Sequence, residues 1–292
     1  MKKLEKWNSI FSGGGLKIFA HIGALKALNE LGVDFDFVSG TSSGSVIATL
    51  YSLGIKTDDM QKIISSRYGN ISKINARNVL GSAFKSLVKN ELSLKSLIDG
   101  SKIEDAMTEM LKDENIEKRS LNEINKNLAI VSCDTISTKE VVFLSKDFNL
   151  INNDRIDYVT NADIAKSVRA SMSFPGVLTP CDFEKYSLID GGTVNNLPTK
   201  ILKDMGAEKI LGIYFKLNPY EPKDDILGVA LRSADIFSIL NMSVAKTYSD
   251  FSLELSIPDT GLLDIKDADS VVEMGYNETM NQKEAILREF KK

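Results

Sequence analysis

The sequence predicts a three-layer α/β/α domain with a mainly parallel central sheet. Short, continuously apolar segments alternate with segments whose apolar residues recur every three or four positions, a pattern typical of buried strands and the helices that cover them. Glycine-rich turns directly follow two of the apolar segments. The 292 residues are 43% hydrophobic and contain no repeat, low-complexity tract or clear linker. We therefore expect a single domain over residues 1–292.

The first strand and helix enclose a run of three glycines. Residues 7–12 (WNSIFS) predict a short buried strand, and Gly13, Gly14 and Gly15 follow at once. Apolar side chains at helical spacing then predict a helix over residues 18–31. The next strand leads into the second glycine turn, so the segment forms a parallel crossover unit. Both turns then lie at the carboxyl ends of strands, which carry the site in open α/β sheets.

The second turn has the pattern of a nucleophile elbow. Residues 36–38 are strand-like, residues 45–53 (SVIATLYSL) predict an apolar helix, and Gly40 and Gly44 bracket Ser42 in the sequence GTSSG. Glycine permits a strained backbone and close approach of neighbouring chain. The turn places Ser42 at a helix N-terminus, where free amides favour a developing negative charge. On the pentapeptide alone, an ordinary turn with an N-capping serine is an equally good interpretation.

The remaining chain continues the alternation of strands and helices. Strands are expected over residues 127–135, 140–144, 186–189, 209–215 and 252–257. Helices are expected over residues 57–68, 102–111, 162–170, 195–206, 225–248 and 270–290. Residues 69–100 include a weakly basic, amphipathic stretch. For that stretch, a solvated helical face packed on the core is favoured over a lid or a membrane-facing cap.

Composition excludes several classes of function. The net charge of −4 and the isoelectric point near 5.3 give no electrostatic case for nucleic-acid binding. Cys133 and Cys181 do not make a disulfide framework, and we expect inert buried thiols in a reducing compartment. The cysteine spacing and the presence of a single histidine argue against zinc, so no metal is expected.

The sequence shows no secretory or membrane-spanning segment. Lys2 and Lys3 are not followed by the apolar region that a secretory signal needs. No run of eighteen apolar residues exists, so any membrane contact is expected to be peripheral and the protein cytoplasmic. The many Lys, Asn and Ile residues are compatible with an AT-rich bacterial genome.

A hydroxyl nucleophile needs a base and an oxyanion hole. Gly13, Gly14 and Gly15 are candidate oxyanion donors; a phosphate-cradling loop is the alternative, but its G-x-G-x-x-G pattern fails at Ile18. His21 lies within the first predicted helix and is expected to be a packed residue rather than a base. Asp190 is the best candidate base, since it ends a predicted strand. The Gly191 and Gly192 that follow permit close approach of substrate or backbone, although many Asp-Gly pairs are simple turns.

These blocks together resemble the patatin-like phospholipase family, and in composition a bacterial member. The matches are GGGLK at residues 13–17, GTSSG at residues 40–44, RAS with the following prolines at residues 169–180, and DGG at residues 190–192. They occur in the family's order over about residues 7–215. The family's glycine box usually ends in glycine, and Ile18 departs from it. Residues 216–292 form a helical region that no motif matches.

The resemblance implies a patatin-like fold and a Ser–Asp dyad. Ser42 is then the nucleophile, Asp190 its direct base, and the glycine run the oxyanion hole, while Gly40, Gly44, Gly191 and Gly192 support the turns. The implied function is a lipid acyl hydrolase of the phospholipase A or lysophospholipase type, with a lipid substrate and no cofactor or metal. A non-lipid esterase or thioesterase stays open. So does a non-catalytic protein that binds lipid or nucleotide.

Overall fold

The computed structural model describes residues 6–72, 99–151, 153–216, 226–258 and 268–290. Most of the amphipathic stretch at residues 69–100 lies outside these ranges. The strands are β1 (Trp7–Phe11), β2 (Phe35–Thr41), β3 (Asn127–Asp134), β4 (Glu140–Leu144), β5 (Ile156–Thr160), β6 (Cys181–Phe183), β7 (Tyr186–Asp190), β8 (Ile210–Phe215) and β9 (Phe251–Leu255). The helices are α1 (Ile18–Glu30), α2 (Ser43–Ser52), α3 (Thr57–Ser72), α5 (Ser101–Asp113), α6 (Ile164–Met172), α7 (Thr199–Asp204), α8 (Ile226–Ala245), α9 (Ala268–Asn281) and α10 (Lys283–Phe290). Within the described residues, 3₁₀ turns lie at 15–17, 121–123, 191–193 and 246–248.

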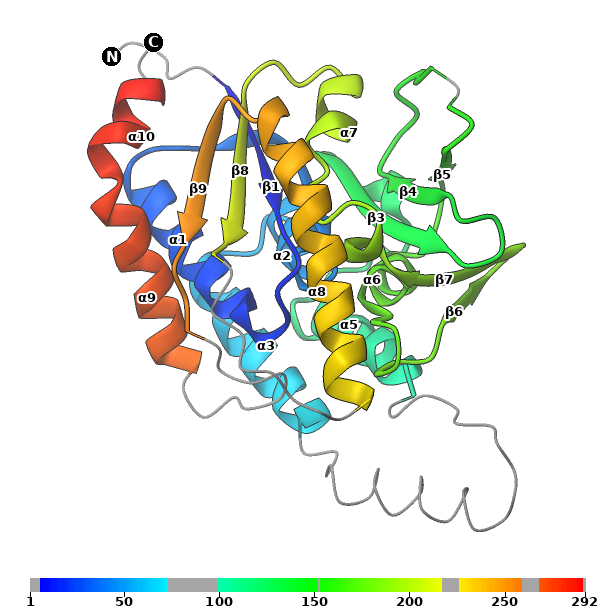
Figure 1. The fold of residues 1–292 in the computed structure, drawn as a ribbon. Helices are drawn as coiled ribbons and strands as arrows, with labels where there is room; N and C mark the ends of the chain where they lie inside the picture. Colours follow the sequence, from blue (N-terminus) through cyan, green and yellow to red (C-terminus); the bar gives the residue numbers. More distant parts are fainter. Residues whose placement is uncertain (1–5, 73–98, 152, 217–225, 259–267, 291–292) are drawn as a thin grey trace.

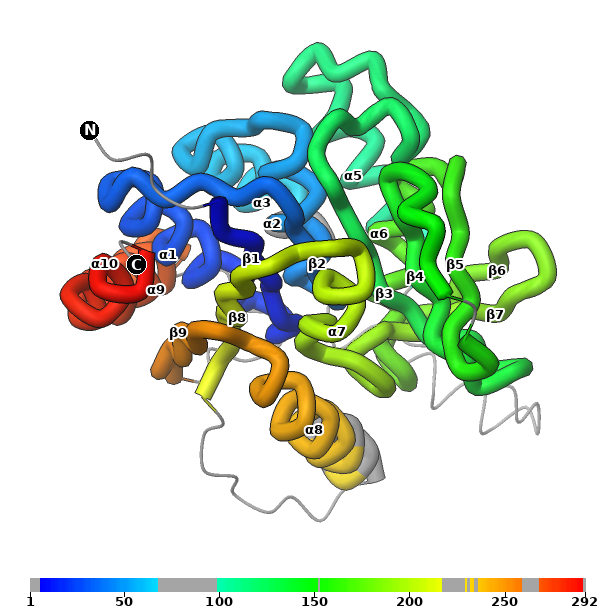
Figure 2. Tube along the Cα trace, turned by 90° about the horizontal axis from the view of Figure 1, so that it is seen from above, coloured from blue at the N-terminus to red at the C-terminus, as the bar shows by residue number. Residues whose placement is uncertain are grey.

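The described strands form one sheet that runs through the middle of the molecule (Figures 1 and 2). Its main path has the order β5-β4-β3-β2-β1-β8-β9, and β7, which also pairs with β6, joins it at β3. The pairs β1–β2, β2–β3, β1–β8, β8–β9 and β4–β5 are parallel, whereas β3–β4, β3–β7 and β6–β7 are antiparallel. The predicted α/β fold with a mainly parallel sheet is therefore confirmed. The C-terminal region contributes an edge strand, β9, as well as helices.

Alternate residues of the central strands enter two different cores. In β3, Leu128 and Ile130 face the larger core, whereas Ala129 and Val131 face the smaller one. Residues of α1, α2, α3, α5, α6, α9 and α10 build the larger core, and α7 with the end of α8 covers the smaller. Because both faces are covered, the central strands are buried over most of their length, which explains why they read as continuous apolar runs.

The C-terminal segment differs from the prediction of one helix over residues 270–290. It forms two helices, α9 and α10, because the Gln282 N–H bonds to Thr279 O, three residues back, and the helix breaks there. The break allows the Phe290 ring to stack on Trp7 of β1, with ring centroids 4.1 Å apart. Figure 1 shows α9 lying along α1, the first helix of the chain.

Two short strands, β5 and β6, were not predicted from the sequence. Only Ile156 is buried in β5, and β6 has three residues, so neither segment carries an apolar run. Both lie at the periphery of the sheet, where β5 pairs with β4 and β6 with β7. Partly exposed edge strands lack the signal of buried ones.

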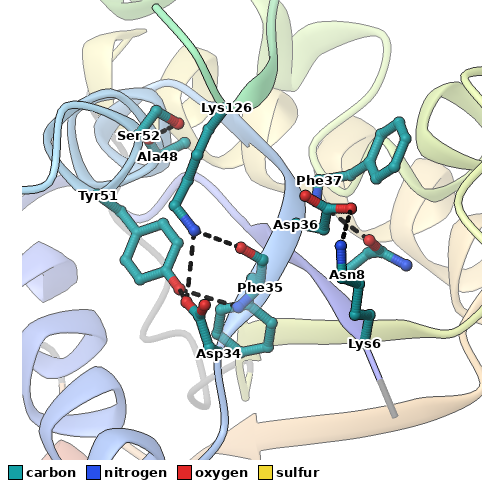
Figure 3. Close-up of polar contacts among 10 residues, drawn as sticks. All are labelled: Lys6, Asn8, Asp34, Phe35, Asp36, Phe37, Ala48, Tyr51, Ser52 and Lys126. Atoms are coloured by element: carbon teal, nitrogen blue, oxygen red, sulfur yellow. Dashed lines mark hydrogen bonds and ion pairs between the residues drawn. The ribbon is translucent and has the colours of Figure 1, made fainter.

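A polar cluster fixes the amino end of β2 against the carboxyl end of α2 (Figure 3). The Tyr51 hydroxyl donates to Asp34 and accepts the Phe35 N–H at 2.9 Å. Lys126 Nζ donates to the Phe35 carbonyl at 2.6 Å and lies over the Tyr51 ring. These contacts hold the start of β2, the strand whose carboxyl end leads into the turn at Ser42.

Candidate active site

Two strands converge end to end along one edge of β3. Strand β2 runs parallel to β3 as far as Thr41, which lies opposite Val131. Strand β7 pairs antiparallel with the next part of the same edge of β3, with Asp190 opposite Ser132. The opposite edge of β3 is occupied by β4 over the same residues. The residue after β2, Ser42, therefore meets the last residue of β7, Asp190.

Ser42 has the strained backbone of a nucleophile elbow. Its φ of 53° and ψ of −129° lie in a region that side-chain-bearing residues rarely adopt. Its N–H donates to Ser171 Oγ at 2.9 Å, which in turn donates to the Val131 carbonyl at 2.6 Å. The turn also needs its glycines: a Cβ on Gly40 would lie 2.2 Å from Gly44 O, and one on Gly44 would lie 2.1 Å from Phe11 O.

Ser42 and Asp190 are joined directly. The Ser42 hydroxyl donates to Asp190 Oδ2 at 2.5 Å, and the Gly192 N–H donates to Asp190 Oδ1 at 2.7 Å. Burial, partly offset by these two hydrogen bonds, raises the pKa of Asp190 to about 6. Gly191 is required here because a Cβ on it would lie 2.3 Å from the Val131 carbonyl. A hydroxyl bonded to a buried carboxylate has the arrangement that a nucleophile and its base require.

The glycine run lies beside Ser42, and side chains hold two of its amides. The Gly13 N–H donates to Asn196 Oδ1 at 2.9 Å, and the Gly14 N–H donates to Ser43 Oγ at 3.1 Å. Gly15 has a positive φ of 58°, and among the described residues its N–H has no acceptor. Gly14 and Gly15 are exposed, so both can face a ligand.

Ile18 causes no distortion of this loop. Its φ of −47° and ψ of −35° are ordinary helical values, and its side chain is completely buried in the larger core. The loop therefore does not need glycine at this position, although the family's box usually ends in one.

His21 is a fully buried helix residue. It lies against the Phe11 and Phe215 rings, and its Nε2 is 2.9 Å from the Ser12 carbonyl, to which it donates. Burial lowers the pKa of His21 to about 4. The direct bond between Ser42 and Asp190 leaves no place between them for an imidazole.

Sequence reasoning missed the side chains that hold the glycine run and the turn at Ser42. Ser43 was visible only as part of GTSSG, Ser171 as part of RAS, and Asn196 as the start of a helix that in the structure begins at Thr199. The sequence signal available for Asn196 was its place in the pair Asn195 and Asn196, shortly after the Asp-Gly-Gly turn. Asn is common in exposed turns, and its side chain is also a good hydrogen-bond acceptor, so the pair alone does not distinguish the two roles.

The side chain of a partly buried residue, Glu140, lies behind the loop that follows Asp190. Glu140 Oε1 accepts from Asn195 Nδ2 at 2.8 Å. Burial raises the pKa of Glu140 to about 7. Asn195 also accepts the Thr41 hydroxyl through its backbone carbonyl at 2.9 Å, so this residue links β4, β2 and the loop.

The described residues contain no cluster of three or more His, Cys, Asp or Glu side chains that could hold a metal ion. Cys133 and Cys181 are both buried, and burial raises the pKa of each thiol. No helix in the described part of the chain has the length and hydropathy needed to cross a bilayer.

Known proteins resemble this chain over most of its length. The mouse "Patatin-like phospholipase domain-containing protein 6" is 27% identical over 300 residues, covering 91% of this chain and 20% of the mouse protein. "Lysophospholipase nte1" of Aspergillus niger is 25% identical over 307 residues, covering 96% of this chain and 18% of the fungal protein. The chain thus spans about a fifth of the length of these relatives.

The fold has relatives among solved structures. VipD from Legionella pneumophila has a TM-score of 0.52 at 15% identity, and the match covers 97% of this chain and 67% of VipD. The family model described as patatin-like phospholipase matches residues 10–203, which include the glycine run, Ser42 and Asp190. Since that match covers well over half of the sequence, the chain belongs to the patatin-like phospholipase family.

Proposed function

We propose that this protein is a lipid acyl hydrolase that cleaves fatty-acyl esters of glycerophospholipids or lysophospholipids through a Ser–Asp dyad. The observation that carries the proposal is the 2.5 Å hydrogen bond from Ser42 Oγ to the buried Asp190 carboxylate. Membership of the family and the name of the fungal relative, a lysophospholipase, support the lipid ester as substrate.

In the first half of the reaction, Asp190 Oδ2 takes the Ser42 proton as Oγ bonds to the ester carbonyl carbon. The tetrahedral oxyanion collapses, the carbon–oxygen bond to the leaving alcohol breaks, and Asp190 returns the proton to that alcohol. In the second half, water attacks the acyl-enzyme and gives its proton to Asp190. Collapse then releases the fatty acid, and the proton returns to Ser42 Oγ.

The oxyanion donors in this proposal are the amides of Gly14 and Gly15. Gly15 N–H has no acceptor among the described residues, and the acceptor of Gly14 N–H is a serine hydroxyl that rotates readily. The Gly13 N–H is instead held by Asn196. In this proposal Gly13 therefore does not donate to the oxyanion, and it instead anchors the loop that carries Gly14 and Gly15.

We further propose that the protein acts at a lipid surface that it contacts peripherally through α8. This helix is fastened beside the catalytic loop, since Asn241 Nδ2 donates to Thr193 O at 3.0 Å. Large apolar side chains recur along its exposed face. They are Val229, Ile236, Phe237, Leu240, Val244 and, just beyond the helix, Tyr248.

Ser42→Ala tests the proposed reaction. The variant should lose several orders of magnitude in the rate of hydrolysis of palmitoyl-lysophosphatidylcholine, and a fluorophosphonate should no longer label the protein. Ser52→Ala is the matched control, because this serine is the last residue of α2, the helix that Ser42 precedes, and its hydroxyl donates to the Ala48 carbonyl. Equal hydrolysis by wild type and Ser42→Ala would refute the proposal. Hydrolysis of a p-nitrophenyl ester without any lipid hydrolysis would identify a non-lipid esterase.

The contact with lipid is tested separately. Phe237→Ser with Leu240→Ser should reduce co-sedimentation with phosphatidylcholine vesicles and leave hydrolysis of a soluble short-chain ester unchanged. Ser243→Ala is the control, since Ser243 is exposed on the same helix. Unchanged co-sedimentation of the double variant would contradict the role of α8.

A further inference from the structure

Three parts of the site converge on the side chain of Asn196. Its Oδ1 accepts the Gly13 N–H at 2.9 Å, and its Nδ2 lies 3.7 Å from Met242 Sδ of α8. A Cβ added to Gly13 would meet Asn196 Oδ1 at 2.7 Å and Ser42 Cβ at 2.8 Å. The carboxamide therefore lies where the glycine run passes the nucleophile, and the residue is buried, with 7% of its surface exposed.

The same oxygen also lies near the base. A Cβ on Gly192 would be 3.1 Å from Asp190 Oδ1 and 3.3 Å from Asn196 Oδ1, so both oxygens border the same small space. Asn196 belongs to the loop that begins at Asp190, whereas Gly13 follows β1. The hydrogen bond between them is thus a direct link between the loop of the base and the loop of the oxyanion donors.

From this convergence we infer that Asn196 is a positioning residue, which holds the glycine run at a fixed distance from Ser42 and Asp190. The inference rests on the proposed function, because it concerns the geometry of that reaction. The bond to the Gly13 N–H anchors the start of the glycine run, whose next two amides, those of Gly14 and Gly15, must point at the oxyanion before the reaction starts. Preorganised donors of this kind are worth most when they need not move during the reaction.

The carboxamide group of Asn196 fits this role better than a carboxylate group would. It supplies a strong acceptor to an amide without adding charge. A carboxylate at the same place would also accept the Gly13 N–H. It would, however, put a second negative charge beside Asp190 and raise the pKa of that base further. Asn196 therefore fixes the loop and leaves the base free to ionise.

The first test replaces Asn196 by Ala, with Asn241→Ala as the matched control. Asn241 donates to the same loop through Thr193 O but does not touch the glycine run. Asn196→Ala should lower kcat by about 10- to 100-fold with a much smaller change in KM, because displaced groups lose rate and not ground-state binding. Asn241→Ala should lose stability without this loss of kcat. Loss of kcat in equal proportion to loss of Tm in both variants would overturn the inference.

The second test uses Asn196→Asp, which keeps an acceptor in place. This variant should recover most of kcat at high pH, and its acid limb should move up by about one pH unit or more. If Asn196 were merely structural, Asn196→Asp would restore stability without restoring kcat at high pH. An Asn196→Asp enzyme as slow as Asn196→Ala at every pH, with an unmoved acid limb, would refute the role.

Exchange of the Gly13 amide with deuterium separates this inference from the proposed function. In protein labelled with ¹³C-serine and ¹⁵N-glycine, the Gly13 amide should exchange faster in Asn196→Ala than in Asn241→Ala. Equal exchange would overturn the link even if the enzyme is active. If wild type hydrolyses no ester, the proposed reaction fails, and the exchange rates still decide whether Asn196 holds the glycine run.

Discussion

The Asp190 carboxylate reaches Ser42 without an intervening imidazole, so the pH dependence of the proposed reaction should report on this one group. Burial raises the pKa of Asp190 to about 6. The base acts in its deprotonated form, and activity is therefore lost as the pH falls through that value. We expect the pH profile of kcat/KM to show an acid limb near pH 6. The Asp190→Asn variant should have no measurable activity at any pH.

This profile reverses an expectation that ordinary pKa values would give. An unperturbed histidine titrates near pH 6.5 and an aspartate near pH 4. In this fold burial lowers the pKa of His21 to about 4 and raises that of Asp190 to about 6. An acid limb near pH 4 in measured kcat/KM would therefore count against Asp190 as the base.

The glycine turns at Ser42 and Asp190 could be predicted because turn chemistry is local, whereas the catalytic roles of the two residues stay a prediction. Their environment could not, because burial of Asp190 depends on β3, which is distant in sequence. The hydrogen bonds made by Ser43, Ser171 and Asn196 could not be predicted either, because each joins residues that are far apart in the chain.

Gly14 has a steric requirement that can be tested by substitution. A Cβ on Gly14 would lie 2.4 Å from two ring carbons of Phe215, a buried residue that must then shift. We expect Gly14→Ala to lower kcat by about 100-fold, as does loss of one oxyanion donor. Adding Phe215→Leu should restore part of that rate. Ester-hydrolysis kinetics of the single and double variants will show whether the two residues are coupled, and additive effects would contradict the steric account.

Among the elements, the packing of α1 on α9 joins the first helix of the chain to one of the last (Figure 1). Glycines on both helices allow the backbones to touch. A Cβ on Gly23 would lie 1.9 Å from Val272 O, and one on Gly275 would lie 2.1 Å from Ala20 O. The sequence predicts both helices from their periodicity, but periodicity does not say which helices pack together, so this contact was not foreseen.

Gly275→Ala should therefore destabilise the protein although alanine favours helix. Overpacking of this kind costs about 1–3 kcal/mol in free energy of unfolding. Glu273→Ala, at an exposed position of the same helix, should have little effect. Chemical denaturation of the two variants measures the difference. A Gly275→Ala protein as stable as wild type would show that the two helices separate at no cost.

For the molecule as a whole, buried carboxyl groups make folding stability depend on pH. The pKa of Glu140 is about 7 in the folded state and near 4.5 in an exposed chain. Between these values the folded protein keeps a proton that the unfolded chain releases. The free energy of unfolding therefore falls as the pH rises from about 4.5 to 7, and the penalty is fully present above pH 7.

Glu140→Gln should remove this penalty while its side-chain oxygen still accepts from Asn195. We expect the Tm of the variant to exceed that of wild type by roughly 3–6 °C at pH 8. The two proteins should melt alike at pH 4, where Glu140 is protonated in both states. Thermal melts at the two pH values provide the measurement, and a gain at pH 4 equal to that at pH 8 would exclude titration of Glu140 as the cause.

The central place of β1 in the sheet also has a consequence for synthesis on the ribosome. Strand β1 begins at Trp7, and one of its two neighbours, β8, begins at Ile210. At 5–20 residues per second, translation delivers β8 about 10–40 seconds after β1. During that interval one edge of β1 has no partner, and open strand edges invite aggregation. Within that interval the nascent chain also holds the glycine turn at Ser42 before Asp190, the proposed base, has been made.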